Sequence, residues 1–523
     1  MNKSGLISHT WSSNYMPGEG VYMLEDGTLF RTIKLSFFGS GAGGGIQKIS
    51  WNGSLMWNFT YYTNNYLSHH DIELLPNGNI LTIAWEYKTR NEAIEKGRDP
   101  NRLQGNILMP DHIIEVKPTG PSSGNIIWEW HVWDHIIQDY DPLKPNYGVV
   151  SDHPELIDIN FGSAEADWMH TNSIDYNEKF DQILISVHNF NEIWVIDHST
   201  TKEEAATHTG GNSGKGGDLL YRWGNPRAYG RGSTGDQKFF SQHDASWIDN
   251  KCLGEGNILI FNNGVDRPGG QYSSVDEIVP PVDDNGNYSI EPGYPYGPEG
   301  QIWIYTAENP ADFYSYYVGG AQRLSNGNTL ICDGANGIFF EVTLENDKIW
   351  EFINPFPNYI NNDVFKIQYI PSQVLPGESD LDCEGSLDWS SIDPGSTVTG
   401  SFKVKNIGTP GSELDWEVQW VPKWGDWLIS PASGEDLTTE DGPVIVQVTC
   451  IAPDEKNEEL KGSIRIRNSE NNSDYDEIPV SLTLPKNKPF NFGANISSWL
   501  LEHFPNAFPI LKHLIGINQR ISN

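Results

Sequence analysis

The sequence predicts an all-β protein, and three observations lead to this class. Strand–turn–strand units recur, as VYMLEDGTLF at Val21, IELLPNGNIL at Ile72, GEGNILI at Gly254 and RLSNGNTLI at Arg323. Glycine, with 52 of 523 residues, supplies turns at short intervals. No long segment before the C-terminus shows the apolar period of an amphipathic helix.

A second repeated unit carries aromatic residues at alternate positions. It occurs as LMWNF at Leu55, IIWEW at Ile126, LLYRW at Leu219, QIWIY at Gln301 and KIWEF at Lys348. Residues two apart in a strand lie on one face, so these aromatic side chains are expected to pack between neighbouring sheets. Repeats of four short strands predict a β-propeller.

The two ends of the repeat region are expected to build a sixth blade together. VFKIQYI at Val364 and GLISHTW at Gly5 supply its strands, and this blade is then one strand short. A start codon further upstream would supply the missing strand, together with a signal peptide. The six-bladed β-propeller is expected over residues 1–372.

Two different segments follow the repeats. Residues 380–486 alternate apolar and polar residues between turn signals, which predicts an immunoglobulin-like β-sandwich that serves as an accessory domain. In residues 487–523, ISSWLLEHF and FPILKHLIGI predict a short amphipathic helical tail. Pro505 and Pro509 interrupt these helices.

Composition excludes several classes of partner. The formal net charge of −36 argues against binding to nucleic acid and to an anionic membrane surface. No apolar run of about 18 residues is present, so no transmembrane helix is expected. No signal peptide is seen at the start of the chain. Cys383 and Cys450 could form a disulfide if the compartment is oxidising.

Three histidines open successive repeats at the same register. His70 precedes DIELLPNGNIL, His170 precedes TNSIDYN and His243 precedes DASWIDN. Equivalent positions in propeller blades face one axis, so the three imidazoles are expected to meet in a central site. The first and fifth repeats have Glu19 and Gly319 at this position, so the repeat itself does not require histidine.

Several ordered motifs resemble those of the arylsulfate sulfotransferases. They are DWMHTNSIDYN at Asp167, LLYRWGNPRAYG at Leu219, FFSQHDASW at Phe239, GNILIFNNGVDR at Gly256 and NGNTLICDG at Asn326, and the resemblance covers most of residues 1–370. It implies a six-bladed propeller that transfers a sulfuryl group from an aryl sulfate to a phenol. No nucleotide sulfate donor and no cofactor are implied.

The resemblance also implies roles for individual residues. His243, in the Gln-His motif, would be the nucleophile that forms a transient sulfohistidine, and His170 an acid–base or donor group. Asn172 completes the His-x-Asn motif, and His70 matches the third histidine, with its neighbour His69 as the alternative. A neutral imidazole is a good nucleophile, and donors aimed at the sulfuryl oxygens would stabilise a loose transition state.

One position departs from the family pattern. The family places an arginine about eighteen residues after the His-x-Asn histidine, where this chain has His188. Arginine is always charged, whereas histidine is neutral over much of the range near pH 7. The acidic protein is expected to raise the pKa of His188. Arg267 and Arg323 are the best-placed arginines to bind sulfate instead, with Arg227 as a further candidate.

Two other functions fit the same convergence of histidines. His70, His170, His188 and His243 could bind zinc or another transition metal, which would make this a metal-dependent enzyme. The protein could also be a non-catalytic surface propeller presented by its sandwich domain. The resemblance implies an extracellular, cell-surface or periplasmic protein.

Overall fold

The computed structural model describes residues 5, 7–24, 26–36, 39–370, 379–408, 412–439, 441–454 and 459–485. The chain divides into two compact units, Met1–Leu375 and Pro376–Asn523. The helical tail expected over residues 487–523 lies outside the described residues.

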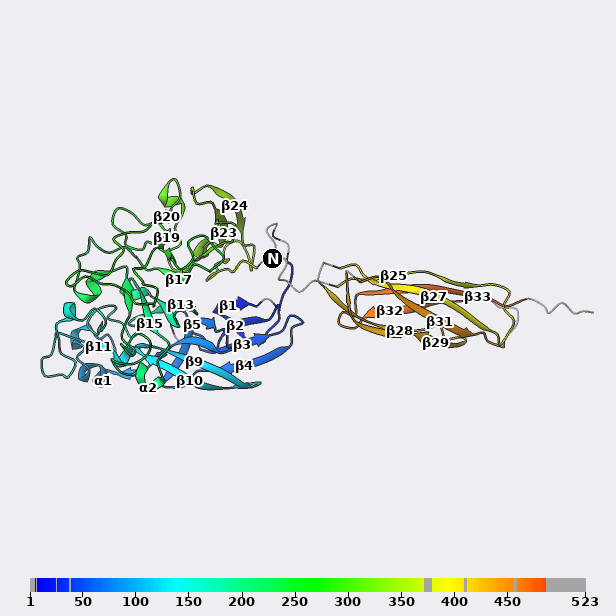
Figure 1. Cartoon of the computed structure of the whole chain (residues 1–523), viewed down its shortest axis with the longest axis horizontal. Helices are drawn as coiled ribbons and strands as arrows, with labels where there is room; N and C mark the ends of the chain where they lie inside the picture. The colour runs from blue at the N-terminus through cyan, green and yellow to red at the C-terminus, as the bar shows by residue number, and fades with distance from the viewer. Residues whose placement is uncertain are drawn as a thin grey trace, which may run out of the picture. The chain divides into compact units, whose positions relative to one another are not determined.

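The described part of the first unit contains five four-stranded antiparallel sheets, each a meander of neighbouring strands (Figure 1). The first three sheets are β1 (Met16–Met23), β2 (Leu29–Lys34), β3 (Gly44–Ile49) and β4 (Leu55–Thr60); β5 (Tyr66–Leu74), β6 (Ile80–Glu86), β9 (Asp111–Gly120) and β10 (Ser123–His131); and β13 (Thr171–Asn177), β14 (Gln182–Val187), β15 (Glu192–Asp197) and β16 (Tyr221–Trp223). The other two are β17 (His243–Trp247), β18 (Ile258–Asn262), β19 (Ser274–Ile278) and β20 (Trp303–Tyr305), and β21 (Gly320–Arg323), β22 (Thr329–Asp333), β23 (Ile338–Val342) and β24 (Lys348–Ile353). The all-β class is confirmed.

Shorter elements lie in the loops between these strands. They are β7 (Lys88–Thr89), β8 (Ile107–Leu108), β11 (Ile136–Ile137), β12 (Ile157–Asp158), α1 (Arg90–Glu95) and α2 (Lys202–Ala205). Single 3₁₀ turns occupy η1 (Pro100–Arg102), η2 (Val132–Asp134), η3 (Val150–Asp152), η4 (His188–Phe190), η5 (Pro226–Tyr229), η6 (Pro310–Asp312) and η7 (Gly334–Asn336). Both α-helices begin with a capping box, in which a threonine and a glutamate three residues later satisfy the first free backbone groups.

The aromatic residues of the outer strands join successive sheets. The indole N–H of Trp57 in β4 donates to Ser123 of the second sheet, and that of Trp128 in β10 donates to Thr200, just after β15 of the third. Likewise the indole N–H of Trp223 in β16 donates to the Pro298 carbonyl, next to the fourth sheet. That of Trp303 in β20 donates to the Leu344 carbonyl, next to the fifth sheet. The predicted packing of these aromatic positions between sheets therefore includes a polar bond from each sheet to the next.

Two irregular segments lie between the fifth sheet and the first. Gly5 lies against the Phe352 ring of β24, and the His9 ring stacks on Trp51 near β4, with ring centroids 3.8 Å apart. In the other segment, Gly319 N–H donates to the Phe365 carbonyl at 3.1 Å, and Met23 N–H of β1 donates to the Gln368 side chain at 3.0 Å.

Neither segment is a strand among the described residues, although both were expected to be strands of a sixth blade. The 364–370 segment instead bonds one neighbour through its backbone and the other through a glutamine side chain, so it does not form a regular ladder. The blade count of six stays a prediction.

The second unit consists of two sheets around a shared core. One has the order β25 (Leu381–Glu384), β27 (Thr397–Asn406), β31 (Val444–Ile451) and β29 (Asp426–Ser430). The other has the order β26 (Leu387–Trp389), β33 (Tyr475–Thr483), β32 (Glu459–Asn468), β28 (Glu413–Trp420) and β30 (Ser433–Thr438). Phe402, Val446, Trp416 and Ile464 meet in the core, as in a β-sandwich.

Two further expectations concern cysteines and membranes. Cys383 and Cys450 are both described and are not bonded to each other, so the expected disulfide is absent from the structure. The reason is position: Cys383 lies in the edge strand β25, whereas Cys450 pairs across β31 with Val398 of β27 and Trp427 of β29. Among the described helices, none is long and apolar enough to cross a membrane.

We predict that Trp128→Phe destabilises the first unit by about 1–3 kcal/mol, because it removes a buried hydrogen bond and part of a packed ring. Urea unfolding followed by fluorescence measures the change. The control is Trp420→Phe in the second unit, where the side chain is 42% exposed. Equal effects of the two substitutions would show that the indole bonds between sheets contribute nothing specific.

Candidate active site

Three strands at the centre of the first unit, β5, β13 and β17, share a local irregularity. Each contains a β-bulge near its histidine, where the pairing register with the next strand shifts. The backbone has positive φ at His70 (50°), His170 (55°) and Asp244 (48°). Left-handed backbone at non-glycine residues is costly and is concentrated at functional sites. The bulges interrupt strand alternation and so control where the histidines point.

Four imidazoles form a continuous group, which we call the histidine cluster. The ring centroids of His70 and His170 lie 4.5 Å apart, those of His170 and His188 5.2 Å, and those of His188 and His243 5.4 Å. The Phe365 ring lies 6.0 Å from His70 and 6.1 Å from His243, and so links the two ends of the group. The structure thus brings together histidines that are up to 173 residues apart in the sequence.

The hydrogen bonds of His243 determine which of its nitrogens is free. The side-chain nitrogen of Asn263 donates to the Ser315 and Val318 carbonyls, so its oxygen faces His243 Nδ1 at 2.8 Å. His243 therefore donates from Nδ1, and its Nε2 carries a lone pair. Burial, followed by the charge of His188, holds the pKa of His243 well below its usual value. The ring is neutral near pH 7 and is competent as a nucleophile.

His170 has the opposite character. Its Nδ1 lies 2.5 Å from an Asp167 carboxylate oxygen. Burial alone would lower the pKa of His170, but the charge and hydrogen bond of Asp167, with the charges of Asp111 and Glu19, raise it above 6.5. Asp167 is held ionised, because the His170 charge offsets the effect of its burial on its pKa. The His170 side chain is 15% exposed, so it reaches solvent.

A chain of buried hydrogen bonds determines which ring nitrogen of His70 carries the proton. His69 Nε2 lies 3.2 Å from Asp111, and its Nδ1 lies 2.7 Å from Nδ1 of His70. When His69 donates to Asp111, it accepts the Nδ1 proton of His70, and Nε2 of His70 is left with a lone pair. Burial and the surrounding histidines hold the pKa of His70 well below its usual value. His69 is therefore a hydrogen-bond partner of His70 and does not take its place in the histidine cluster.

His188 is neutral, and the expectation that its pKa is raised was wrong. Burial, with the charge of His170 next, lowers this pKa to about 4. Its Nδ1 lies 2.9 Å from the Asn189 oxygen, and the Asn189 nitrogen donates to the Asp167 carbonyl. The net acidity of the chain does not control this group, because desolvation of a buried imidazole outweighs distant charges.

The other predicted binding residues are engaged elsewhere. Asn172 donates to the Gln242 carbonyl at 2.8 Å and so braces the peptide before His243. Arg267 stacks over Tyr272 and donates to Ser274, and Arg323 forms an ion pair with Glu277 at 2.5 Å. The side-chain hydrogen bonds and ion pairs of these three residues go to groups outside the histidine cluster. Arg227 is exposed and lies in η5.

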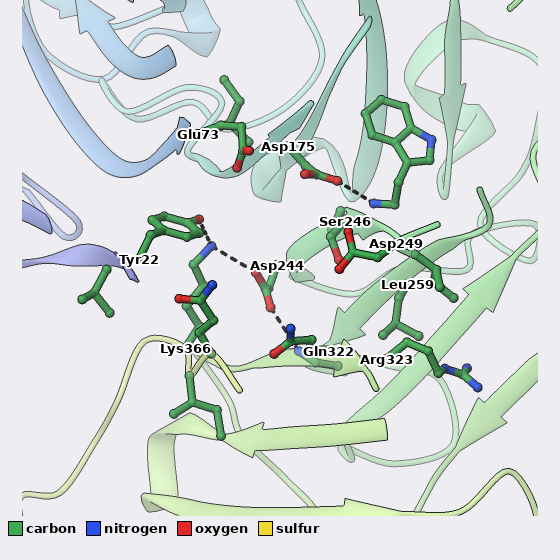
Figure 2. Close-up of a pocket in the computed structure, with 18 residues that line it drawn as sticks. Tyr22, Glu73, Asp175, Asp244, Ser246, Asp249, Leu259, Gln322, Arg323 and Lys366 are labelled. Carbon is green, nitrogen blue, oxygen red and sulfur yellow. Dashed lines mark hydrogen bonds and ion pairs between the residues drawn. The ribbon is translucent and has the colours of Figure 1, made fainter. Parts of the chain in front are cut away.

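The residues that follow two of the histidines, Asp71 and Asp244, belong to a second polar group. Lys366 Nζ lies 2.8 Å from Asp71. It also lies 3.3 Å from Asp244 and bonds the Tyr22 hydroxyl (Figure 2). A cavity of about 170 Å³ adjoins these residues, and Glu73 and Asp175 also line it. Burial lowers the pKa of Lys366, but the Asp71 charge and its other partners raise it well above the usual value. Lys366 therefore joins the β5 and β17 bulges as a fixed cation.

Sequence reasoning missed several residues that position the site. Asp167 lies inside the DWMH motif, three residues before His170, and this short spacing could have indicated a contact between the two side chains. Asn263 lies within FNNG, which was quoted only as a motif. Asp111, Phe365 and Lys366 come from other strands and segments, and no local pattern links them to the histidines.

Fold and site together define an all-β protein of small antiparallel sheets with an imidazole cluster suited to covalent group transfer. Residues 8–369 match the family model described as Arylsulfotransferase (ASST). The chain therefore belongs to the arylsulfotransferase family. Membership supports an arylsulfotransferase-like function, with small-molecule aryl sulfate and phenol substrates.

Comparison with curated proteins and with solved structures adds little about function. No curated protein matches the chain. A protein of unknown function from Bacteroides caccae is 12% identical, with 68% of this chain and 86% of that chain covered and a TM-score of 0.35. Virginiamycin B lyase from Staphylococcus aureus is 10% identical, with 83% and 95% covered and a TM-score of 0.32. A streptogramin B lyase is 10% identical, with 84% and 95% covered and a TM-score of 0.31.

We predict that Lys366→Met lowers the free energy of unfolding of the first unit by about 3–5 kcal/mol, because it leaves buried carboxylates without their cation. Urea unfolding measures this loss. The control is Lys348→Met, which removes an exposed pair with Glu351 and is expected to cost about 0–1 kcal/mol. A loss for Lys366→Met as small as that of the control would contradict a clamping role.

Proposed function

We propose that this protein is an aryl-sulfate sulfotransferase that works through a sulfohistidine on His243 and uses no nucleotide sulfate. The single observation that carries the proposal is the pairing of a neutral ring with a charged one. His243 has a free Nε2 lone pair, and the contact with Asp167 raises the pKa of His170, two rings along the cluster, which favours its protonated form. One supplies a nucleophile and the other an acid.

In the first half-reaction, His243 Nε2 attacks the sulfur of the aryl sulfate, and the bond from sulfur to the aryl oxygen breaks. The aryl oxygen takes the Nε2 proton of His170 and leaves as a phenol. The His243 ring becomes a sulfoimidazolium, and the Asn263 oxygen that accepts its Nδ1–H stabilises the new positive charge. General acid catalysis of this kind contributes about 10²–10⁴-fold.

The second half-reaction reverses the roles. The acceptor phenol gives its proton to the neutral His170, and its oxygen attacks the sulfur. The N–S bond breaks, the electron pair returns to His243 Nε2, and the aryl sulfate product leaves with His170 again protonated. Both rings recover their starting state, so the cycle is ping-pong and needs no further reactant.

The remaining rings contribute to binding of the sulfuryl group. In the free protein, His70 and His188 present acceptors, so neither replaces an arginine as a donor. A bound sulfate monoanion raises the pKa of a neighbouring imidazole, because it favours the charged form. We therefore propose that donor binding is coupled to proton uptake at His188 or His70. This is how the cluster would bind an anion without an arginine.

We predict that His243→Asn abolishes transfer from a chromogenic aryl sulfate to a phenol, with a loss of roughly 10³-fold or more, because the nucleophile is removed. The wild-type protein incubated with donor alone carries an acid-labile sulfo group on the peptide containing His243, detected by mass spectrometry. His153→Asn is the control, since its side chain is 48% exposed and pairs with Glu155. Residual transfer by His243→Asn at the wild-type rate would refute the proposal.

The pH profile tests the role of His170. Asp167 raises the pKa of His170, so the acid form persists to higher pH than in an unperturbed imidazole and is lost as pH rises through that pKa. We predict that Asp167→Asn moves the alkaline limb of the rate profile to lower pH, because the charge that raises this pKa is removed. The rate at pH 8 then falls by about 10–100-fold.

Asp347→Asn, at an exposed position, is the control for the pH experiment. It is expected to keep the wild-type profile. An unshifted alkaline limb in Asp167→Asn would show that His170 is not the acid of the reaction.

A further inference from the structure

A second group of ligand-type side chains lies outside the histidine cluster. His135 follows η2, and His208 and Asp218 lie in the loop after α2. Nδ1 of His135 lies 2.8 Å and Nδ1 of His208 2.7 Å from the same Asp218 oxygen. One ligand atom from each residue lies within 4.8 Å of the other two. Two imidazoles and a carboxylate are a donor set that Zn²⁺ prefers.

We propose that His135, His208 and Asp218 bind a divalent transition metal ion, of which Zn²⁺ is the best match. Tetrahedral zinc with bonds of about 2.0–2.1 Å holds its ligand atoms roughly 3.3 Å apart. The oxygen and nitrogen atoms here need to separate by roughly half an ångström to reach that spacing. His208 is 61% exposed, so a fourth position is open to water.

The surroundings of His135 match those of a metal ligand. Its Nε2 lies 2.9 Å from the Ala205 carbonyl, which can only accept a hydrogen bond. A ligating histidine usually donates its second ring nitrogen to such a carbonyl, which fixes the tautomer and leaves the first nitrogen free for the metal. In that tautomer the Nδ1 lone pair of His135 faces a carboxylate oxygen. A cation between the two atoms, either a proton or a metal ion, is then required.

The loop between the ligands favours the metal. Gly210, Gly211, Gly214 and Gly216 all have positive φ, and they fold the chain so that His208 and Asp218 meet. Ordering several glycines is entropically costly, and a metal ion that binds only the folded loop stabilises it. A Cβ at Gly217 would lie 2.5 Å from His135 Nε2 and 2.1 Å from the Ala205 carbonyl, so the loop packs directly on this contact.

The test uses full-length protein stripped with a chelator and titrated with Zn²⁺, with Co²⁺ as a spectroscopic probe. We expect about one equivalent to bind and Co²⁺ to show a tetrahedral absorption spectrum. His208→Ala, an exposed position that leaves the fold intact, is expected to weaken binding at least tenfold. His153→Ala is the matched control and keeps wild-type affinity.

A second measurement reports on the loop itself. Lys202 and Lys215 flank His208, so trypsin cleaves the open loop at these sites. Zn²⁺ is expected to slow this cleavage in the wild-type protein but not in His208→Ala.

The proposal is overturned if His208→Ala binds Zn²⁺ as the wild type does, or if binding is lost only in His243→Asn. The first outcome leaves His135 and Asp218 as a hydrogen-bonded pair without a metal, and the second places the metal in the histidine cluster. Sulfuryl transfer by His208→Ala should equal that of the wild type, so this result is independent of the proposed function.

Discussion

Lys366 is the cation that two central strands share, and the geometry of the site depends on it. Its ammonium group binds Asp71 of β5 and Asp244 of β17. Each of these aspartates directly follows a histidine of the cluster. The backbone has positive φ at His70 and at Asp244, and the ion pairs restrain the two bulges that carry His70 and His243.

Burial and local charges give the four imidazoles of the histidine cluster different pKa values. The Asp167 carboxylate contacts His170 and raises its pKa, whereas burial lowers the pKa of His188 and His243, whose amide partners carry no charge to offset it. Neighbouring imidazoles cannot all carry charge in a buried site, and one cation lowers the pKa of the others. The same residue type thereby provides neighbouring rings whose pKa values are shifted in opposite directions.

Much of this organisation was readable from the sequence, and the limits have physical causes. The repeats predicted the all-β class, and the common register of three histidines predicted their convergence, because both depend on local periodicity. The state of His188 was mispredicted because burial is a property of the folded neighbourhood. Lys366 was missed because its partners lie 122 to 344 residues away in the sequence, and only the packing of the sheets brings them together.

The position of Phe365 and Lys366 near the end of the first unit has a consequence for biosynthesis. Ribosomes release the histidine-bearing strands long before this last segment emerges. A nascent chain that has already formed β5, β13 and β17 still lacks the Phe365 ring, which lies near both His70 and His243. It also lacks the Lys366 charge that restrains the bulges of β5 and β17. The histidine cluster with its surrounding contacts is thus complete only when translation has passed the final stretch of this unit, and shorter fragments of it would lack these contacts.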